Sequence, residues 1–171
     1  MPTYLLTWNP KLWSDHQRKK FVKEIAITAS GTPLEMRWST GRRKNIRAGD
    51  RLFIVRQGAE PRGIIAAGWA IGESFQGAHW KNKTSSRKMW YVMGRYDRIL
   101  NADFPDYEPP LSTASFTSQP LASVRWSPRS GGVEVPEYVA EIFEELWEDH
   151  LEEVNRLTAE VISDPGADRL R

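Results

Sequence analysis

Three short segments of the sequence each combine an aromatic ring with polar or cationic side chains. Residues 38–44 read Trp-Ser-Thr-Gly-Arg-Arg-Lys, residues 8–9 read Trp-Asn, and residues 79–81 read His-Trp-Lys. A Trp ring can stack on a nucleobase, hydroxyl and amide groups can hydrogen-bond the edge of that base, and Lys or Arg can contact phosphate. We therefore expect a nucleobase pocket. Its expected residues are Trp8, Asn9, Trp38, Ser39, Thr40, His79 and Trp80.

Basic side chains surround two of these segments, and the charge along the chain is uneven. Residues 1–99 hold nineteen Lys or Arg and seven Asp or Glu, whereas residues 100–171 hold five and fifteen, although the net charge is only +2. A basic segment predicts an anionic partner. The alternative is that the basic part and the acidic last helix neutralise each other. The side chains expected to contact a nucleic-acid backbone are Arg42, Arg43, Lys44, Lys81, Lys83, Arg87 and Lys88.

The sequence lacks the residue sets that most enzymes and metal sites need. It has no Cys, which excludes disulfides, thiolate zinc sites and cysteine nucleophiles, and its three His argue against a multi-histidine metal site. It contains no phosphate-binding loop, no Gly-x-Ser-x-Gly and no His-Glu-x-x-His motif. We therefore expect no catalytic residue, no metal and no cofactor, so that the protein is not an enzyme. An enzyme whose site is assembled from distant residues remains an alternative.

Short strands and two helices are expected to position the candidate pocket. Apolar runs bounded by turn residues predict strands at residues 3–8, 34–38, 51–56, 63–71, 89–100 and 122–126. Helical spacing predicts one helix between Ser14 and Gly31 and an acidic helix from Pro136 to Leu157. Residues 39–48 and 75–88 are expected to be loops. Short strands between turn signals favour a small barrel or a strongly curled sheet.

The eight Trp residues are expected to divide between the core and the pocket. Periodic apolar segments contain Trp69, Trp90 and Trp147, which predicts that these three are buried in the core. Strand ends next to polar loops contain Trp8, Trp38 and Trp80, which is where binding residues gather. Trp13 and Trp126 are not assigned by their surroundings. The alternative is an interaction domain in which every Trp is core.

Several blocks, taken in order, resemble an EVE domain, a member of the wider PUA-like group that is similar to the YTH readers. The blocks are residues 4–8, 37–41, 48–54, 56–58, 61–64, 79–80, 126, 130–131, 135–136 and 146–147, together with the strand at Tyr91. The resemblance covers roughly residues 3–150. It is closest to EVE-like modules attached to HNH nucleases in modification-dependent restriction, although this sequence has no HNH segment.

The resemblance implies a fold and a function. The fold is α+β, a PUA-like curled β-barrel flanked by helices, with the domain at residues 1–160 and a flexible C-terminal tail at 161–171. The pocket would receive a flipped modified base, with Trp38-Ser39 and Trp80 as two of its walls. The expected function is a reader of modified DNA, with 5-methylcytosine or a relative as the base. The alternative is a PUA- or YTH-like module that binds RNA or N6-methyladenine.

The expected partners and location follow from the same reading. The partners are modified DNA, with RNA as the alternative, and a nuclease domain or subunit that acts in trans. A cytoplasmic location and no membrane partner are expected, because no signal peptide is visible. The longest uncharged apolar run, Gly63–Gly72, is also far shorter than the roughly 18 residues of a membrane span.

Overall fold

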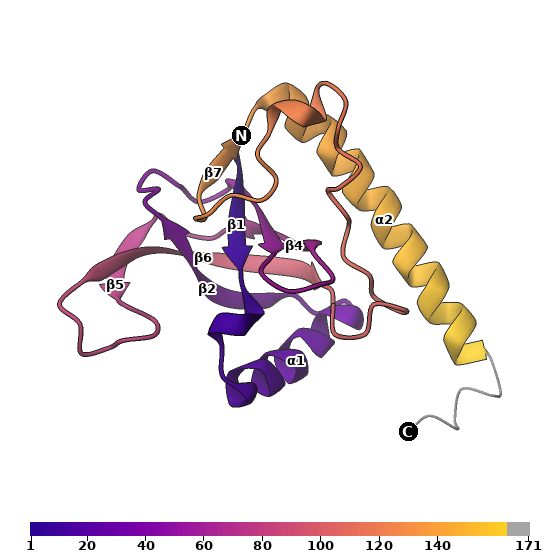
Figure 1. Cartoon of the computed structure of the whole chain (residues 1–171), viewed down its shortest axis with the longest axis horizontal. Helices are drawn as coiled ribbons and strands as arrows, with labels where there is room; N and C mark the ends of the chain where they lie inside the picture. Colours follow the sequence, from indigo (N-terminus) through magenta and orange to yellow (C-terminus); the bar gives the residue numbers. More distant parts are fainter. Residues whose placement is uncertain (164–171) are drawn as a thin grey trace.

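Seven strands form one mixed sheet in the computed structural model, which describes residues 1–163 (Figure 1). The strands are β1 (Thr3–Trp8), β2 (Leu34–Gly41), β3 (Arg51–Arg56), β4 (Gly63–Ala70), β5 (Phe75–Ala78), β6 (Lys88–Ile99) and β7 (Val133–Val135). Their order is β2-β6-β4-β3-β1-β7, and β5 pairs with β6 outside this path. Only β1 and β3 run parallel among these pairs. Strands β3 and β4 are almost entirely buried in the centre of the sheet.

The sheet curls until its edge strand β2 approaches β1. The indole N–H of Trp38 on β2 donates a hydrogen bond to the carbonyl of Thr7 on β1 at 3.0 Å. The gap between the two strands is filled by residues 130–132, where the amide of Gly132 donates to the Leu5 carbonyl at 2.7 Å. The predicted α+β fold with a curled sheet flanked by helices is therefore confirmed.

Helix α1 (Asp15–Ala29) begins at the expected residue. Ser14 and Gln17 form a capping box, in which each side chain accepts the backbone N–H of the other residue. The helix buries Phe21, Ile25 and Thr28 against β2 and β6. A one-turn helix η1 (Pro10–Leu12) links it to β1.

Helix α2 (Glu137–Ser163) packs on the other side of the sheet, along the right of Figure 1. The rings of Phe143 and Trp147 lie 4.5 and 6.1 Å from the ring of Phe53 on β3. Glu144 accepts two hydrogen bonds from the guanidinium of Arg51, at 2.7 and 3.0 Å. Such a bidentate pair is the strong form of this contact. The acidic helix therefore neutralises one residue of the basic part, which partly supports the neutralisation alternative. No helix within residues 1–163 has the length and apolarity to cross a membrane.

Several elements differ from the predicted ones, and strand β7 has no predicted counterpart. Strand β2 continues to Gly41, into the predicted loop, because it pairs with β6 at Ser39↔Tyr91 and Gly41↔Trp90. The predicted loop 75–88 contains β5, which also pairs with β6. The predicted strand 122–126 is absent. A one-turn helix η2 (Leu121–Ser123) forms there instead. The Trp126 indole N–H donates a hydrogen bond to its Leu121 carbonyl at 2.8 Å.

A further difference concerns the end of the last helix. Helix α2 continues through Ser163, beyond the predicted helix end at Leu157 and into the predicted tail at 161–171. Residues 164–171 of that tail lie outside the described residues.

The predicted core positions of the Trp residues hold only in part. Trp147 is buried as expected, and Trp126 is buried against Phe116 and Phe143. The prediction for Trp69 is wrong, because its side chain is 38% exposed and lies under the Arg51 guanidinium. Trp90 is only half-buried. Apolar residues in a strand do not reveal which face of the strand is covered.

Candidate functional site

Four aromatic rings pack together where β1, η1, α1 and β2 meet. Trp8 lies 5.1 Å from Phe21 and 5.5 Å from Trp13, measured between ring centroids. Trp13 in turn lies 5.8 Å from Trp38. Aromatic pairs at these separations attract one another beyond simple burial, by about 0.5–1.5 kcal/mol each. The cluster therefore joins β1, α1 and β2 through Trp13, which lies between η1 and α1.

A cavity of about 710 Å³ lies against this cluster, and we call it the aromatic cavity. Its aromatic lining residues are Trp8, Trp13, Phe21, Trp38, Trp80 and Tyr91. The volume falls in the range of about 300–1,000 Å³ that small-molecule sites occupy. The cavity is therefore large enough for a nucleotide-sized ligand, and six aromatic rings form part of its wall.

Cations and amides complete the lining of the aromatic cavity. The polar lining residues are Thr7, Asn9, Gln17, Lys20, Glu24, Arg37, Ser39, Gln57, Lys83, Arg129 and Ser130. Glu24 is neutralised by Lys20 at 3.4 Å, and the Arg37 guanidinium lies 4.3 Å from the centre of the Tyr91 ring. Lys83 and Arg129 form no ion pair with any residue in the described part of the chain. The cavity therefore carries a net positive rim.

Five of the seven predicted pocket residues line this cavity together. They are Trp8, Asn9, Trp38, Ser39 and Trp80. Trp8 and Trp38 are only 6% and 7% exposed, so each is at once a core residue and part of the cavity wall. Trp80 is half-buried and comes from the loop between β5 and β6. The sequence analysis assigned each Trp either to the core or to the pocket, but Trp8 and Trp38 belong to both.

The prediction that Thr40 contacts a base is not supported, because Thr40 is fully buried away from the aromatic cavity. Its hydroxyl donates to the Arg43 carbonyl at 2.7 Å, and its own carbonyl accepts the Arg43 amide at 3.0 Å. These two hydrogen bonds close the turn after β2. Thr40 therefore shapes the chain beside the cavity instead of facing a ligand.

His79 also lies outside the lining of the aromatic cavity. Its Nδ1 accepts the backbone amides of Lys81 and Asn82 at 3.2 and 3.3 Å, and its ring stacks on Trp80 with a centroid separation of 6.1 Å. His79 therefore holds Trp80 in place. Asn9 has a mixed role, because its Oδ1 already accepts the Lys11 amide at 3.0 Å, while its NH₂ group and the second lone pair of Oδ1 remain for a ligand.

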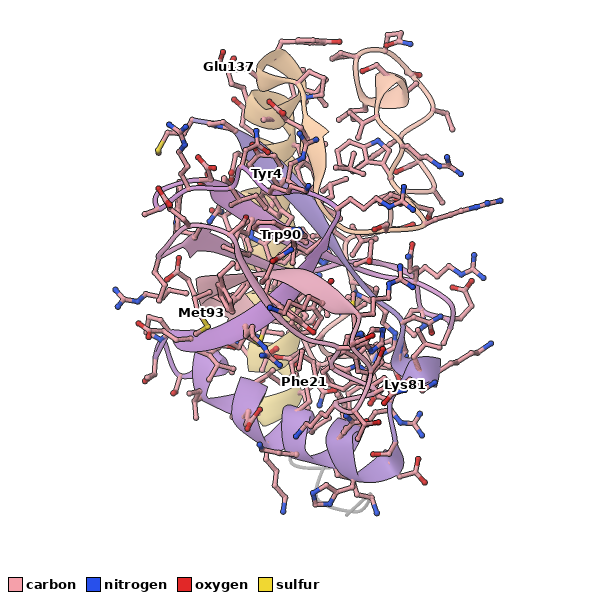
Figure 2. The ribbon with its side chains drawn as sticks, turned by 90° about the vertical axis from the view of Figure 1, so that its left-hand side faces the viewer. Tyr4, Phe21, Lys81, Trp90, Met93 and Glu137 are labelled. Atoms are coloured by element: carbon pink, nitrogen blue, oxygen red, sulfur yellow. The ribbon has the colours of Figure 1, made fainter. Side chains whose placement is uncertain are left out.

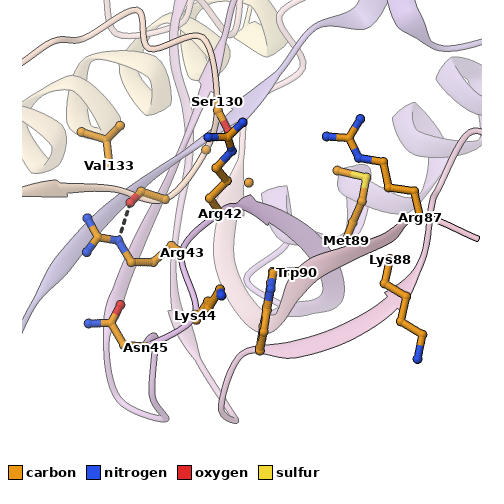
Figure 3. A pocket seen from close by; sticks show the side chains of 13 residues that line it. Arg42, Arg43, Lys44, Asn45, Arg87, Lys88, Met89, Trp90, Ser130 and Val133 are labelled. Atoms are coloured by element: carbon orange, nitrogen blue, oxygen red, sulfur yellow. Dashed lines mark hydrogen bonds between the residues drawn. The ribbon is translucent and has the colours of Figure 1, made fainter.

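The seven predicted backbone-binding cations separate into groups. Five of them line a second cavity of about 800 Å³, which we call the cationic cavity (Figure 3): Arg42, Arg43, Lys44, Arg87 and Lys88. Lys83 lines the aromatic cavity, and Lys81 lines neither cavity. Figure 2 shows Lys81 near the α1 end of the molecule, at the level of Phe21. Arg43 is already engaged, since it donates to the Gly132 carbonyl at 2.8 Å and pairs with Glu134 at 3.6 Å.

Sequence reasoning missed several residues of the aromatic cavity. They include Trp13, Phe21, Arg37, Gln57, Tyr91 and Arg129. A signal existed for Trp13, which directly precedes the helix-capping Ser14 and so had to lie close to α1. No local pattern indicates Arg129, because the loop that carries it is attached by a long-range hydrogen bond from the Gln57 amide to the Pro128 carbonyl at 2.9 Å.

One polar group of the aromatic cluster is buried without a hydrogen-bond partner in the described part of the chain. The indole N–H of Trp8 is buried and has no acceptor among residues 1–163, while the Arg56 guanidinium lies 5.3 Å from the ring centre. A buried donor without a partner costs about 1–3 kcal/mol. No three His, Asp or Glu side chains within the same described range are grouped so that they could hold a metal ion.

Comparisons with known proteins find two solved structures of similar shape and no matching family. No protein-family model and no curated protein matches the chain. A crystal structure of a protein from Pseudomonas syringae is 15% identical, covers 84% of this chain and 99% of its own, and has a TM-score of 0.47. A hypothetical protein from Leishmania major is 17% identical, covers 87% of this chain and 96% of its own, and has a TM-score of 0.39. Scores this low carry no argument about function, and the EVE resemblance stays a prediction.

Proposed function

We propose that the protein binds DNA and holds one flipped, modified base, 5-methylcytosine or a relative, in the aromatic cavity. The observation that carries the proposal is a cavity of nucleotide size whose aromatic walls meet a cationic rim. Ring faces stack on a base, and cations neutralise the phosphates that must come with it. We also propose a cytoplasmic location, with a nuclease in trans as the partner that acts on the bound DNA.

The energy scale is consistent with a reader. Flipping a base costs a few kcal/mol, and stacking on aromatic side chains returns about 1–3 kcal/mol per base. One extra methyl group in a fitted pocket is worth about 1–3 kcal/mol, or roughly tenfold to two-hundredfold in affinity. Phosphate contacts supply the remaining affinity and make it dependent on salt. Selectivity should therefore come from the aromatic cavity.

The test is a titration of duplexes that differ in one base, followed by fluorescence anisotropy. The duplexes carry cytosine, 5-methylcytosine, 5-hydroxymethylcytosine, adenine or N6-methyladenine, and an RNA of the same sequence competes. We expect one modified DNA to bind roughly tenfold to two-hundredfold more tightly than its plain counterpart. Equal affinities for all duplexes would overturn the modification claim, and stronger binding of the RNA would favour the RNA alternative.

A matched pair of variants tests the cavity itself. Trp80→Ala removes a half-buried ring that lines the cavity from a loop, so the fold should survive. Trp69→Ala removes a 38% exposed ring outside both cavities. We expect Trp80→Ala to weaken binding of the preferred duplex roughly fivefold to a hundredfold, as loss of one stacking partner does. If the two variants bind alike, the aromatic cavity is not the base site.

A further inference from the structure

The cationic cavity lies directly beside the aromatic cavity, and a shared wall separates them. Both linings contain Gly41, Met89, Ser130 and Gly131. The wall is thin because Gly41 and Gly131 carry no side chains. A Cβ on Gly41 would lie 2.6 Å from the Gly131 carbonyl oxygen, and one on Gly131 would lie 3.0 Å from the Ser39 carbonyl oxygen. A ligand that fills one cavity therefore lies close to a ligand that fills the other.

Charge in the cationic cavity is largely uncompensated. Five of its lining residues are Lys or Arg and none is Asp or Glu. Apart from Arg43, these cations form no ion pair with any residue among the 163 that are described. Figure 3 shows Arg42 beside Ser130 and Arg87 on the opposite side of the cavity, with the Arg87 guanidinium directed toward the Arg42 side, whereas Lys88 points away. Two opposed guanidinium groups suit a phosphate, which they can bind through paired hydrogen bonds.

An aromatic ring lies in the same cavity as these cations. Trp90 on β6 is half-buried, lines the cationic cavity, and has the Lys44 ammonium 5.7 Å from its ring centre. Its neighbour Tyr91 lines the aromatic cavity. Successive residues of a strand point to opposite faces, so β6 serves both cavities. Proteins that bind single-stranded nucleic acid combine an accessible aromatic ring, on which a base stacks, with cations that contact the phosphates.

We propose that the cationic cavity holds the nucleotide next to the flipped base on the same DNA strand. The base of that nucleotide stacks on Trp90, and its phosphate lies between Arg42 and Arg87. This inference rests on the proposed function, because it takes the flipped base in the aromatic cavity as its starting point. It adds that the protein opens the strand beside the modified base and contacts two successive nucleotides.

The experiment is a double-mutant cycle between the protein and the DNA. One duplex carries the modified base alone, and two others carry an abasic nucleotide immediately 5′ or 3′ of it, which removes the neighbouring base and keeps the phosphate. Each is titrated by anisotropy against wild type, Trp90→Ala, Trp90→Phe and the control Trp69→Ala. Wild type should lose roughly fivefold to a hundredfold in affinity for one of the two abasic duplexes.

Coupling between the two changes decides the result. Trp90→Ala should lose the same factor on the intact duplex and no further affinity on that abasic duplex, because the interaction is already gone. Trp90→Phe keeps a ring and should retain most of the affinity, while Trp69→Ala should bind as wild type does. Independent, multiplying losses, or no effect of either abasic neighbour, would overturn the inference.

The two proposals fail in different ways. If wild type prefers the modified duplex and the effects of Trp90→Ala and the abasic neighbour are independent, the subsite is overturned and the base reader stands. If wild type shows no preference for any modified base, the proposed function falls, and the subsite falls with it as a neighbour of a flipped base.

Discussion

The two cavities lie on either side of one wall yet are built in opposite ways. Trp8 and Trp38 of the aromatic cavity are less than a tenth exposed and are locked by other rings, whereas Arg42, Lys44, Arg87 and Lys88 of the cationic cavity are exposed. A packed ring holds a fixed shape, because interiors are as dense as organic crystals. An exposed cation acts at a distance and adapts to its partner. The aromatic cavity is therefore suited to selecting a ligand and the cationic cavity to adding affinity.

The largest expected effect comes from removing one buried ring of the aromatic cavity. Trp38→Ala leaves a hole among Trp13, Phe21 and the Thr7 carbonyl, so we expect it to lower the free energy of unfolding by about 3–5 kcal/mol. Urea denaturation measures this loss. Trp69→Ala, at an exposed position, should lose much less. A loss below about 1 kcal/mol for Trp38→Ala would show that the cluster is not the rigid part of the site.

The next effect should come from the wall between the cavities. Gly41 has φ of +62°, which L residues rarely adopt, and a Cβ there would meet residues 130–131. Gly41→Ala should therefore cost about 1–3 kcal/mol of stability and weaken both base preference and total affinity. Gly72→Ala is the control, since nothing lies within 4 Å of its Cβ. If Gly41→Ala changed only one of the two binding properties, the cavities would be independent.

A smaller effect should distinguish the contribution of charge to affinity from the preference for a modified base. Arg42→Ala and Arg87→Ala each remove one phosphate contact, so each should make the slope of log affinity against log salt shallower by about 0.7–0.9. The ratio of affinities for modified and plain duplexes should not change. Lys23→Ala removes an exposed charge that lines neither cavity and serves as the control. A changed affinity ratio would show that the cationic cavity also takes part in selecting the base.

The smallest effect lies in α2, away from both cavities. Burial lowers the pKa of His150 below its ordinary value, and its Nε2 lies 2.7 Å from the Pro109 carbonyl. Because the unfolded chain takes up this proton more readily, stability is fully present above about pH 6.5 and declines as the pH falls below it. His150→Gln should flatten this decline in thermal unfolding at pH 5–7. Base preference should be unchanged in the variant, so an altered preference would connect α2 to the site.

The sequence was sufficient for features that depend on near neighbours. The Ser14–Gln17 capping box and the apolar stripe of α2 are local patterns, and both helices begin where the sequence predicts them. The blocks at residues 8–9, 38–39 and 80 identified side chains that do lie together around one cavity. Local chemistry thus predicted part of the lining of one cavity.

Tertiary structure alone decided the rest, because side-chain roles depend on what covers each face. The exposure of Trp69 and Trp90 depends on which face of the curled sheet is left uncovered by other elements. The division of the cations into two cavities depended on residues 130–132 entering the gap between β1 and β2, about ninety positions along the chain from β2. Such contacts leave no local pattern, since they are set by how the sheet curls and not by the residues beside them.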